Sequence, residues 1–424
     1  MMSKQINDFM RFLDAGNSRF PASAQIADRL EKAGFAELKE SAEFKLKKAG
    51  KYYIRRMDTA IIAFVMGSKP LCENGFAMTS SHIDSPSLKL KPESIKLDHD
   101  ACRVGVEVYG GPILHTWVDR ELSISGRVII KKGKGQEAKT IDLKKPVAII
   151  PNAAIHMNRE INKGFEYNKQ NHLQAILSVQ KHEGNPLKNL IADHLKVKPE
   201  EILEMDLYLY DVQPSSLVGI EEDLIVSGRL DNLAMTHAIL SGIIAAKNPA
   251  QTSVAVFFDH EEVGSESPQG ANSSLLTEVL ERISLSQKGS REDFYRALRQ
   301  SFMISADMAH AYHPAYSEKY DPDYSPLMNK GPVIKRNTNL RYATTSDSSL
   351  RFIQLCKKAK VQHQEFLVRS DMPCGSTVGP MVAALLGIPT VDIGNPMWAM
   401  HSVRETGGTR DHEDLIKVLE LYFA

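Results

Sequence analysis

Five clusters of polar side chains follow short apolar stretches of this chain, and they constrain its fold more than any other feature. The apolar stretches have the length of strands and are rich in β-branched and aromatic residues. In an open α/β sheet, ligands bind beyond the carboxyl ends of the strands, so residues from distant parts of the chain can meet there. The sequence therefore predicts one shared site. The clusters are 81–84 (SHID), 230–232 (LDN), 259–262 (DHEE), 306–308 (ADM) and 400–402 (MHS).

Bulk composition excludes several classes of partner. The 424 residues are 42% hydrophobic and 25% charged, which is typical of a globular chain with more than one domain. Lys plus Arg and Asp plus Glu both number 52, so no overall field favours nucleic acid or an anionic membrane. The four cysteines form no C-x-x-C pair, and no signal peptide or membrane-spanning stretch is apparent. We expect a cytoplasmic protein that binds neither nucleic acid nor membrane.

The pattern of expected elements divides the chain into two parts. Residues 1–91 and 226–424 alternate strand-like and helix-patterned segments, which predicts an α/β domain with a mostly parallel mixed sheet flanked by helices. Among its expected elements are a helix over 267–283 and a strand over 366–368. Residues 92–225 contain short strands and Gly-containing turns, which predicts an inserted β-rich domain.

The side chains in the polar clusters are those that bind divalent metal ions. Imidazole and carboxylate groups suit zinc, manganese or cobalt without discriminating sharply among them, and a carboxylate can bridge two ions. Two ions about 3.5–4 Å apart polarise a carbonyl and activate a shared water at neutral pH. The sequence therefore predicts a two-metal hydrolase acting on amides. The candidate ligands are His82, Asp231, Glu262, Asp307 and His401.

Two further acidic residues are expected to assist the metal centre. Asp84 follows His82 by two residues, so in an extended segment both side chains point the same way, and Asp84 can accept a hydrogen bond from the histidine ring. Glu261 and Glu262 are adjacent and point in different directions. We expect Glu262 to bind metal and Glu261 to transfer protons.

Extended motifs around these residues resemble the aspartyl aminopeptidases, a family of cocatalytic zinc exopeptidases. The resemblance implies that His82 and Asp307 bind one zinc ion and that Glu262 and His401 bind the other. It also implies that Asp231 bridges both ions and that Glu261 is the general base. The similar stretches occur in order along nearly the whole chain: 80–86 (SSHIDSP), 227–232 (SGRLDN), 259–265 (DHEEVGS), 306–311 (ADMAHA), 331–335 (GPVIK), 341–343 (RYA), 373–377 (PCGST) and 399–405 (AMHSVRE).

The resemblance further implies a substrate and an assembly. His310, Lys335 and Tyr342 match positions that contact substrate, and an ammonium group there would pair with the side chain of an amino-terminal Asp or Glu. The motif 155–159 (IHMNR) implies that His156 enters a neighbouring subunit's active site, where it can stabilise the oxyanion. Family members form tetrahedral dodecamers, so the inserted domain is expected to serve oligomerisation.

We therefore expect an aminopeptidase that releases Asp or Glu from peptides with a free amino terminus. One alternative is the branch of the same family that prefers neutral residues. Others are a dinuclear-zinc deacylase or dipeptidase, and an inactive scaffold. The scaffold alternative conflicts with the presence of every expected ligand and of Glu261.

Overall fold

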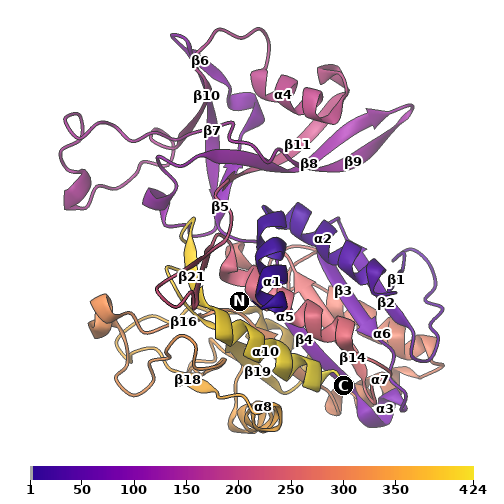
Figure 1. Ribbon diagram of the computed structural model, residues 1–424. Coiled ribbons are helices and arrows are strands. Elements are labelled where there is room, and N and C mark those ends of the chain that lie inside the picture. The colour runs from indigo at the N-terminus through magenta and orange to yellow at the C-terminus, as the bar shows by residue number, and fades with distance from the viewer. Residues whose placement is uncertain (1–2) are drawn as a thin grey trace.

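The computed structural model describes residues 3–424 and contains two layered parts joined by the chain around residues 86 and 212 (Figure 1). The lower part in Figure 1 holds a nine-stranded sheet covered by helices, and the upper part holds a seven-stranded sheet with one helix. The helices are α1 (Lys4–Ala15), α2 (Arg19–Lys32), α3 (Leu71–Asn74), α4 (Pro186–Leu195), α5 (Leu230–Ala245), α6 (Leu275–Ser286), α7 (Arg291–Arg299), α8 (Ser346–Ala359), α9 (Val378–Leu386) and α10 (Thr409–Tyr422).

The nine-stranded sheet has parallel strands at its centre, where β14, β4, β15 and β19 run side by side in that order. Strands β2, β3 and β17 introduce antiparallel pairs toward the edges, so the sheet is mixed. This confirms the expected α/β class. In spatial order the strands are β1 (Ala36–Glu37), β2 (Lys51–Arg56), β3 (Ala60–Val65), β14 (Thr252–Phe258), β4 (Phe76–His82), β15 (Phe302–Ala306), β19 (Thr390–Gly394), β17 (Val333–Lys335) and β18 (Gln364–Phe366).

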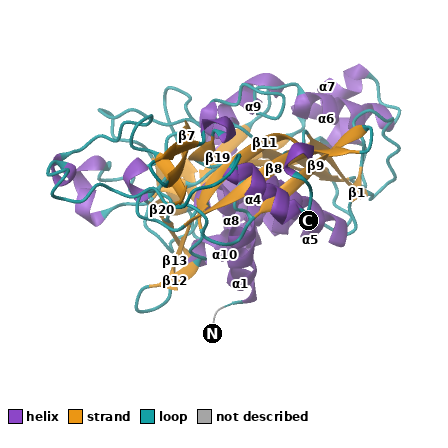
Figure 2. Cartoon of the chain, turned by 90° about the horizontal axis from the view of Figure 1, so that it is seen from above, coloured by secondary structure: helices purple, strands orange, loops and turns teal. Residues whose placement is uncertain are grey.

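Helices cover both faces of this sheet, and successive side chains of a strand point to opposite faces, so side chains on both faces are buried. In β14, Ala255 and Phe257 face the cluster that contains α1, α2, α5, α8 and α10, whereas Val254 and Val256 face the cluster that contains α3, α6, α7 and α9. The two sets of helices lie on opposite sides of the strands in Figure 2. Burial on both faces explains why the central strands are apolar throughout.

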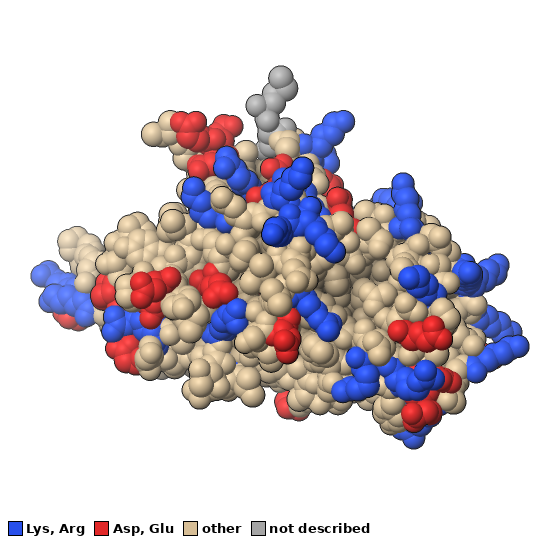
Figure 3. All heavy atoms as spheres, turned by 90° about the horizontal axis from the view of Figure 1, so that it is seen from below, with Lys and Arg blue, Asp and Glu red and all other residues tan. Residues whose placement is uncertain are grey.

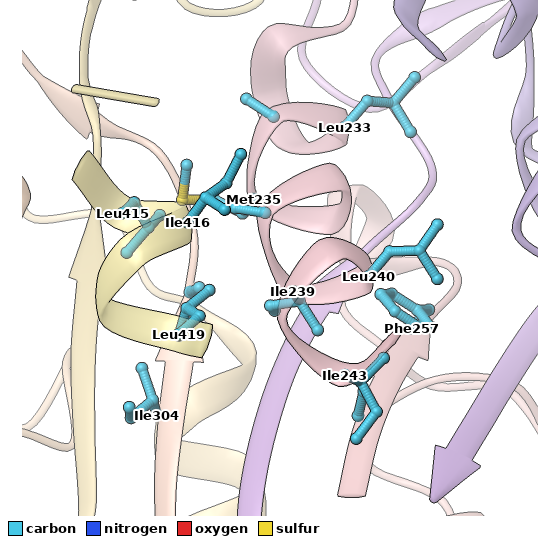
Figure 4. Packing of buried hydrophobic residues seen from close by; sticks show 14 of the residues in the cluster. Leu233, Met235, Ile239, Leu240, Ile243, Phe257, Ile304, Leu415, Ile416 and Leu419 are labelled. Carbon is cyan, nitrogen blue, oxygen red and sulfur yellow. The ribbon is translucent and has the colours of Figure 1, made fainter. Parts of the chain in front are cut away.

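Helix α5 is apolar on every side because it lies between the sheet and other helices. Leu240 packs near Phe257 of β14, and Ile416 of α10 covers the opposite side of the helix (Figure 4). A helix that is hydrophobic all round is typical of a fully buried one. This buried helix carries Asp231 at its first turn.

The seven-stranded sheet forms the β-rich part, and its neighbouring strands pair antiparallel. It includes β5, which precedes the expected boundary at residue 92, so this sheet begins earlier than that boundary. Its strands are β10 (Gln174–Ser178), β7 (Ala101–Tyr109), β5 (Ser87–Leu90), β11 (Ile202–Asp211), β8 (Leu122–Lys132) and β9 (Gly135–Asp142), with β6 (Lys96–Asp98) beside β7.

A third sheet of five short strands supplies two of the five polar clusters. Asp231 follows β13 and His401 follows β20, so these residues do not come from the nine-stranded sheet. Only the clusters after β4, β14 and β15 end strands of the large sheet. The strands of the third sheet are β12 (Ser216–Val218), β13 (Leu224–Ser227), β21 (Glu405–Gly408), β20 (Pro396–Trp398) and β16 (Ala309–His310).

Two expected elements differ in position. The helix expected over 267–283 is α6 and begins only at Leu275, because residues 265–274 form turns whose Gly270 packs against the backbone of Ser265. The strand expected over 366–368 is β18 and ends at Phe366, where its parallel partner β17 also ends. Figure 3 shows the molecule from below, and on this face basic and acidic side chains are interspersed, in keeping with a net charge of zero.

Candidate metal centre

The structure brings all five expected metal ligands together. One group of potential ligand atoms comprises His82, Asp231 and Asp307, and a second comprises Asp231, Glu262 and His401. Within each group the ligand atoms lie within 4.8 Å of one another. A third such group comprises His82, Glu261 and Glu262. Asp231 belongs to the first two groups, so the sets that contain His82 with Asp307 and Glu262 with His401 share one carboxylate.

Asp231 has the orientation that a bridging carboxylate needs. Its Oδ1 lies 3.5 Å from Nε2 of His82, and its Oδ2 lies 3.4 Å from Nε2 of His401. The two oxygens therefore face different histidines. On the His401 side, Oε2 of Glu262 lies 3.5 Å from the same Nε2 atom.

Backbone carbonyls orient both histidine rings. Nδ1 of His82 lies 3.0 Å from the carbonyl oxygen of Asp84, and Nδ1 of His401 lies 3.1 Å from that of Gly111. A carbonyl can only accept a hydrogen bond, so each Nδ1 carries a proton. The Nε2 atoms are thereby left to face the carboxylates, which is the arrangement that metal-binding histidines require.

The residues fit divalent metal ions. Oδ1 of Asp231 and Oε1 of Glu262 are buried and have no hydrogen-bond partner among residues 3–424. Burial and the nearby Asp231 raise the pKa of Glu262 well above its usual value. Crowded, desolvated carboxylates of this kind are costly unless a cation compensates them, and imidazole with carboxylate suits zinc.

Protons compete with metal at the two histidines. Burial opposes the charged form of His401, but Asp231 and Glu262 raise its pKa to about 10. Burial likewise opposes the charge on His82, and Asp231 and Asp84 outweigh it and raise its pKa. Metal binding must therefore release protons, and it weakens as the pH falls.

Glu261 lies at the edge of the centre on the turn that follows β14. Its Oε2 is 3.8 Å from Nε2 of His82, and its side chain is 17% exposed, whereas that of Glu262 is 5% exposed. Burial, together with Asp307 and Asp84, raises the pKa of Glu261 to about 8. The two glutamates thus face different histidines, and Glu261 is the more exposed of the two.

Asp84 is a buried carboxylate that contacts His82 and the turn of the two glutamates. Its carboxylate lies 3.4 Å from Nδ1 of His82 and is 1% exposed. It also accepts hydrogen bonds from the backbone N–H groups of Glu261 and Glu262, at 3.2 and 3.1 Å. The turn that carries both glutamates therefore depends on Asp84.

The expected substrate residues lie on the Asp307 side of the centre. Nζ of Lys335 is 3.7 Å from Oδ1 of Asp307, donates to the carbonyl of Met308 at 3.1 Å, and lies 5.1 Å from the ring centroid of Tyr342. His310 is exposed, and its ring packs edge-on against Phe366. Lys335 itself is only 2% exposed.

His156 is not at the metal centre of its own chain. It lies in the loop between β9 and β10 and is exposed, beside Ile155 and Met157, which are 49% and 83% exposed. Among residues 3–424, no hydrogen bond or ion pair links His156 to the metal-site residues. Its expected role in another subunit remains a prediction.

The sequence analysis did not single out Glu405. This buried residue of β21 accepts hydrogen bonds from the backbone N–H groups of Asp231 and His401, at 3.0 and 2.7 Å. It lies within the motif 399–405, but a glutamate beside a glycine-rich strand gave no separate signal. Its partners are backbone N–H groups, so no side-chain pattern in the sequence marks it.

Comparison with known proteins identifies the family. A family model described as aminopeptidase I zinc metalloprotease (M18) matches residues 12–423. The chain belongs to the M18 family. It is 45% identical over 427 residues to a probable M18 family aminopeptidase 2 from Clostridium novyi (strain NT), covering 99% of this chain and 98% of the relative.

Solved structures agree with this M18 assignment. The chain matches one from a cryo-EM structure of the Ape4 and Nbr1 complex with a TM-score of 0.95 and 36% identity, covering 99% of this chain and 85% of that one. It matches a chain of the S. cerevisiae mApe1 dodecamer with a TM-score of 0.87 and 26% identity, covering 98% and 95%.

The M18 assignment makes this protein a zinc metallo-aminopeptidase, and hence a hydrolase. It confirms the family resemblance and the enzyme class expected from the sequence. Among residues 3–424, no helix combines the length and the apolar character needed to cross a bilayer.

Proposed function

We propose that this M18 enzyme removes amino-terminal Asp or Glu from peptides. The observation that carries this proposal is the ammonium group of Lys335, which is 2% exposed and 3.7 Å from the metal-site carboxylate of Asp307. A desolvated cation beside the reacting centre favours a substrate whose first side chain is an anion. His310 and Tyr342 flank the same region and are proposed to contact that side chain.

The proposed centre holds two zinc ions in each subunit. His82 and Asp307 would hold the first, Glu262 and His401 would hold the second, and Asp231 would serve both. When bound, the ions polarise the substrate carbonyl and activate water. The shared grouping of Asp231 supports this assignment.

Glu261 is proposed as the general base. Its Oε2 lies 3.8 Å from Nε2 of His82, and its carboxylate is outside the proposed ligand set, so it is available to take a proton and return it. Glu261 therefore accepts a proton at its carboxylate and delivers it to the leaving amine. Asp84 keeps Glu261 in place through the backbone of the turn.

His156 is proposed to act in a neighbouring subunit of a homo-oligomer. The exposed apolar side chains of Ile155 and Met157 beside it favour burial against another chain. The mApe1 protein, which is similar along nearly its whole length, forms a dodecamer. We propose a dodecamer here too, with tetrahedral symmetry and with His156 as a donor to the oxyanion.

Initial rates on peptides that begin with Asp, Glu, Leu, Ala or Lys test this function, with added zinc or manganese and a chelator control. The expected result is chelator-sensitive release of Asp and Glu in preference to the other residues. Preference for Leu would retain the metal mechanism and move the chain to the neutral-residue branch. Release from no peptide would contradict the proposal.

A further inference from the structure

The end of strand β7 reaches from the seven-stranded sheet to the metal centre of the same chain. Tyr109, the last residue of β7, donates a hydrogen bond from its hydroxyl to Oδ2 of Asp84 at 2.7 Å. Asp84 in turn accepts the backbone N–H groups of Glu261 and Glu262. One tyrosine of the β-rich part therefore fixes the carboxylate on which the catalytic turn rests.

The Tyr109 ring is itself held firmly. The guanidinium carbon of Arg19 lies 5.2 Å from its centroid, and the Tyr208 ring meets it edge-on at 6.2 Å. These contacts come from α2 and from β11 of the seven-stranded sheet. A hydroxyl on a ring that is packed in this way has a defined position.

The residues that follow Tyr109 orient His401, in the second half of the centre. The carbonyl of Gly111 accepts the Nδ1 proton of His401 at 3.1 Å, and the backbone N–H of Ile113 donates to the His401 carbonyl at 2.9 Å. Both contacts link the β-rich part to a ligand almost 300 residues later in the chain, since 290 positions separate Gly111 from His401. The ring orientation of His401 is thus set from outside the nine-stranded sheet.

Gly110 completes the contact by close approach. Its φ is +69°, and a Cβ at this position would lie 3.2 Å from Cβ of Glu262. Glycine is therefore needed both for the backbone conformation and for the space beside a ligand.

We propose that the segment 109–111 is a positioning element for the metal centre, so that the inserted part of each chain sets the zinc affinity of its own active site. This role is separate from any role of that part in assembly. It rests on the ligand assignment under the proposed function. Groups that orient metal ligands typically change metal affinity 10- to 100-fold when removed.

Tyr109→Phe tests the tyrosine, with Tyr210→Phe as the matched control. Tyr109 is half-buried and Tyr210 is buried, and both hydroxyls donate to an aspartate, but the partner of Tyr210 is Asp142, which is not one of the expected metal ligands. We expect Tyr109→Phe to weaken zinc binding about 10- to 100-fold in competition with a chromophoric chelator. We also expect it to lower kcat more than it changes KM, and to alter the visible spectrum of the cobalt-substituted enzyme. Tyr210→Phe should match the wild type in each measurement.

Gly110→Ala tests the same element without removing a hydrogen bond. Gly133 is its control, because its φ is +60° and nothing lies within 4 Å of a Cβ there. Gly133→Ala introduces the same kind of backbone strain in the β8–β9 turn. We expect only Gly110→Ala to weaken zinc binding, by at least tenfold.

Melting temperatures of the metal-free variants separate misfolding from loss of metal. The proposal is overturned if the folded Tyr109→Phe and Gly110→Ala proteins bind two zinc ions with affinities within twofold of the wild type. It is also overturned if each control loses as much affinity as its partner variant. A wild-type protein that binds no zinc would instead contradict the ligand assignment.

Discussion

The carboxylate of Glu405 accepts a hydrogen bond from the backbone N–H of Asp231 at 3.0 Å, although 174 positions separate the two residues. Asp231 is the carboxylate shared by both halves of the metal centre. Glu405 is 2% exposed, and its other oxygen accepts the N–H of His401. One buried glutamate therefore joins the backbones of the proposed bridging ligand and a proposed terminal ligand.

Glu405→Gln should weaken metal binding because a carboxamide has one acceptor oxygen and cannot serve both N–H groups. We expect zinc affinity to fall about 10- to 100-fold and the free energy of unfolding to fall by about 1–3 kcal/mol. Chelator competition and urea unfolding measure these effects. Glu365→Gln, which affects a half-buried glutamate paired with Arg336, is the control. Equal affinity in the folded Glu405→Gln protein would contradict the prediction.

Glu261→Gln and Asp231→Ala should separate proton transfer from metal binding. Glu261→Gln removes a base but keeps the ligands, so we expect kcat to fall by a factor on the order of 10²–10⁴ while two metal ions are retained. Asp231→Ala removes the shared ligand, so metal content should fall as well. Elemental analysis of the purified variants decides between these outcomes. Equal metal loss in both variants would show that Glu261 is a ligand.

Lys335→Met should mainly affect acidic substrates. Methionine retains apolar volume but removes the ammonium, so we expect kcat/KM for Asp and Glu peptides to fall about 10- to 100-fold relative to Leu peptides. Lys330→Met alters an exposed lysine nearby and should leave the ratio unchanged. An unchanged ratio in Lys335→Met would restrict Lys335 to supporting Asp307.

Mixed assemblies should reveal whether His156 acts between subunits. The His156→Ala subunit keeps Glu261, and the Glu261→Gln subunit keeps His156. If His156 acts in a neighbouring chain, co-assembly of the two inactive variants creates some complete sites, and activity returns. Activity that stays at the level of the separate variants after confirmed co-assembly would place His156 outside the neighbouring site.

A buried histidine pair outside the metal centre should contribute less to stability as the pH falls below neutral. Nδ1 of His237 lies 2.9 Å from Nε2 of His412, and both residues are 1% exposed. Burial lowers the pKa of His237 below its ordinary 6.5 and that of His412 well below it. At these two sites the unfolded chain therefore binds more protons below pH 6.5 than the folded chain does, so the pair's contribution to stability falls as the pH falls.

The loss approaches about 1.4 kcal/mol per pH unit for each histidine that stays neutral in the folded state. His412→Gln keeps a polar partner for His237 and removes one titrating group, so it should reduce this slope. Urea unfolding of the metal-free protein between pH 5 and 8 measures it. Parallel curves for the variant and the wild type would contradict the prediction.

The sequence was sufficient to predict the α/β class and to single out the candidate ligands of the M18 centre. Both depend on local patterns: apolar runs of strand length, and histidines and carboxylates placed where those runs end. His82 illustrates this, because it ends the strand on which the motif predicted it. Element ends were less predictable where turns decide them, as at the late start of α6.

Only the tertiary structure decided what surrounds the ligands. Asp231 and His401 follow strands of the five-stranded sheet. Glu405 accepts hydrogen bonds from their backbone N–H groups, which every residue except proline possesses. The contacts of Tyr109 and Gly111 likewise depend on how the inserted part packs over the large sheet. The contacts of Glu405 with Asp231 and of Gly111 with His401 join residues 174 and 290 positions apart, through N–H and carbonyl groups that carry no side-chain signal. They therefore appear only when the chain is folded.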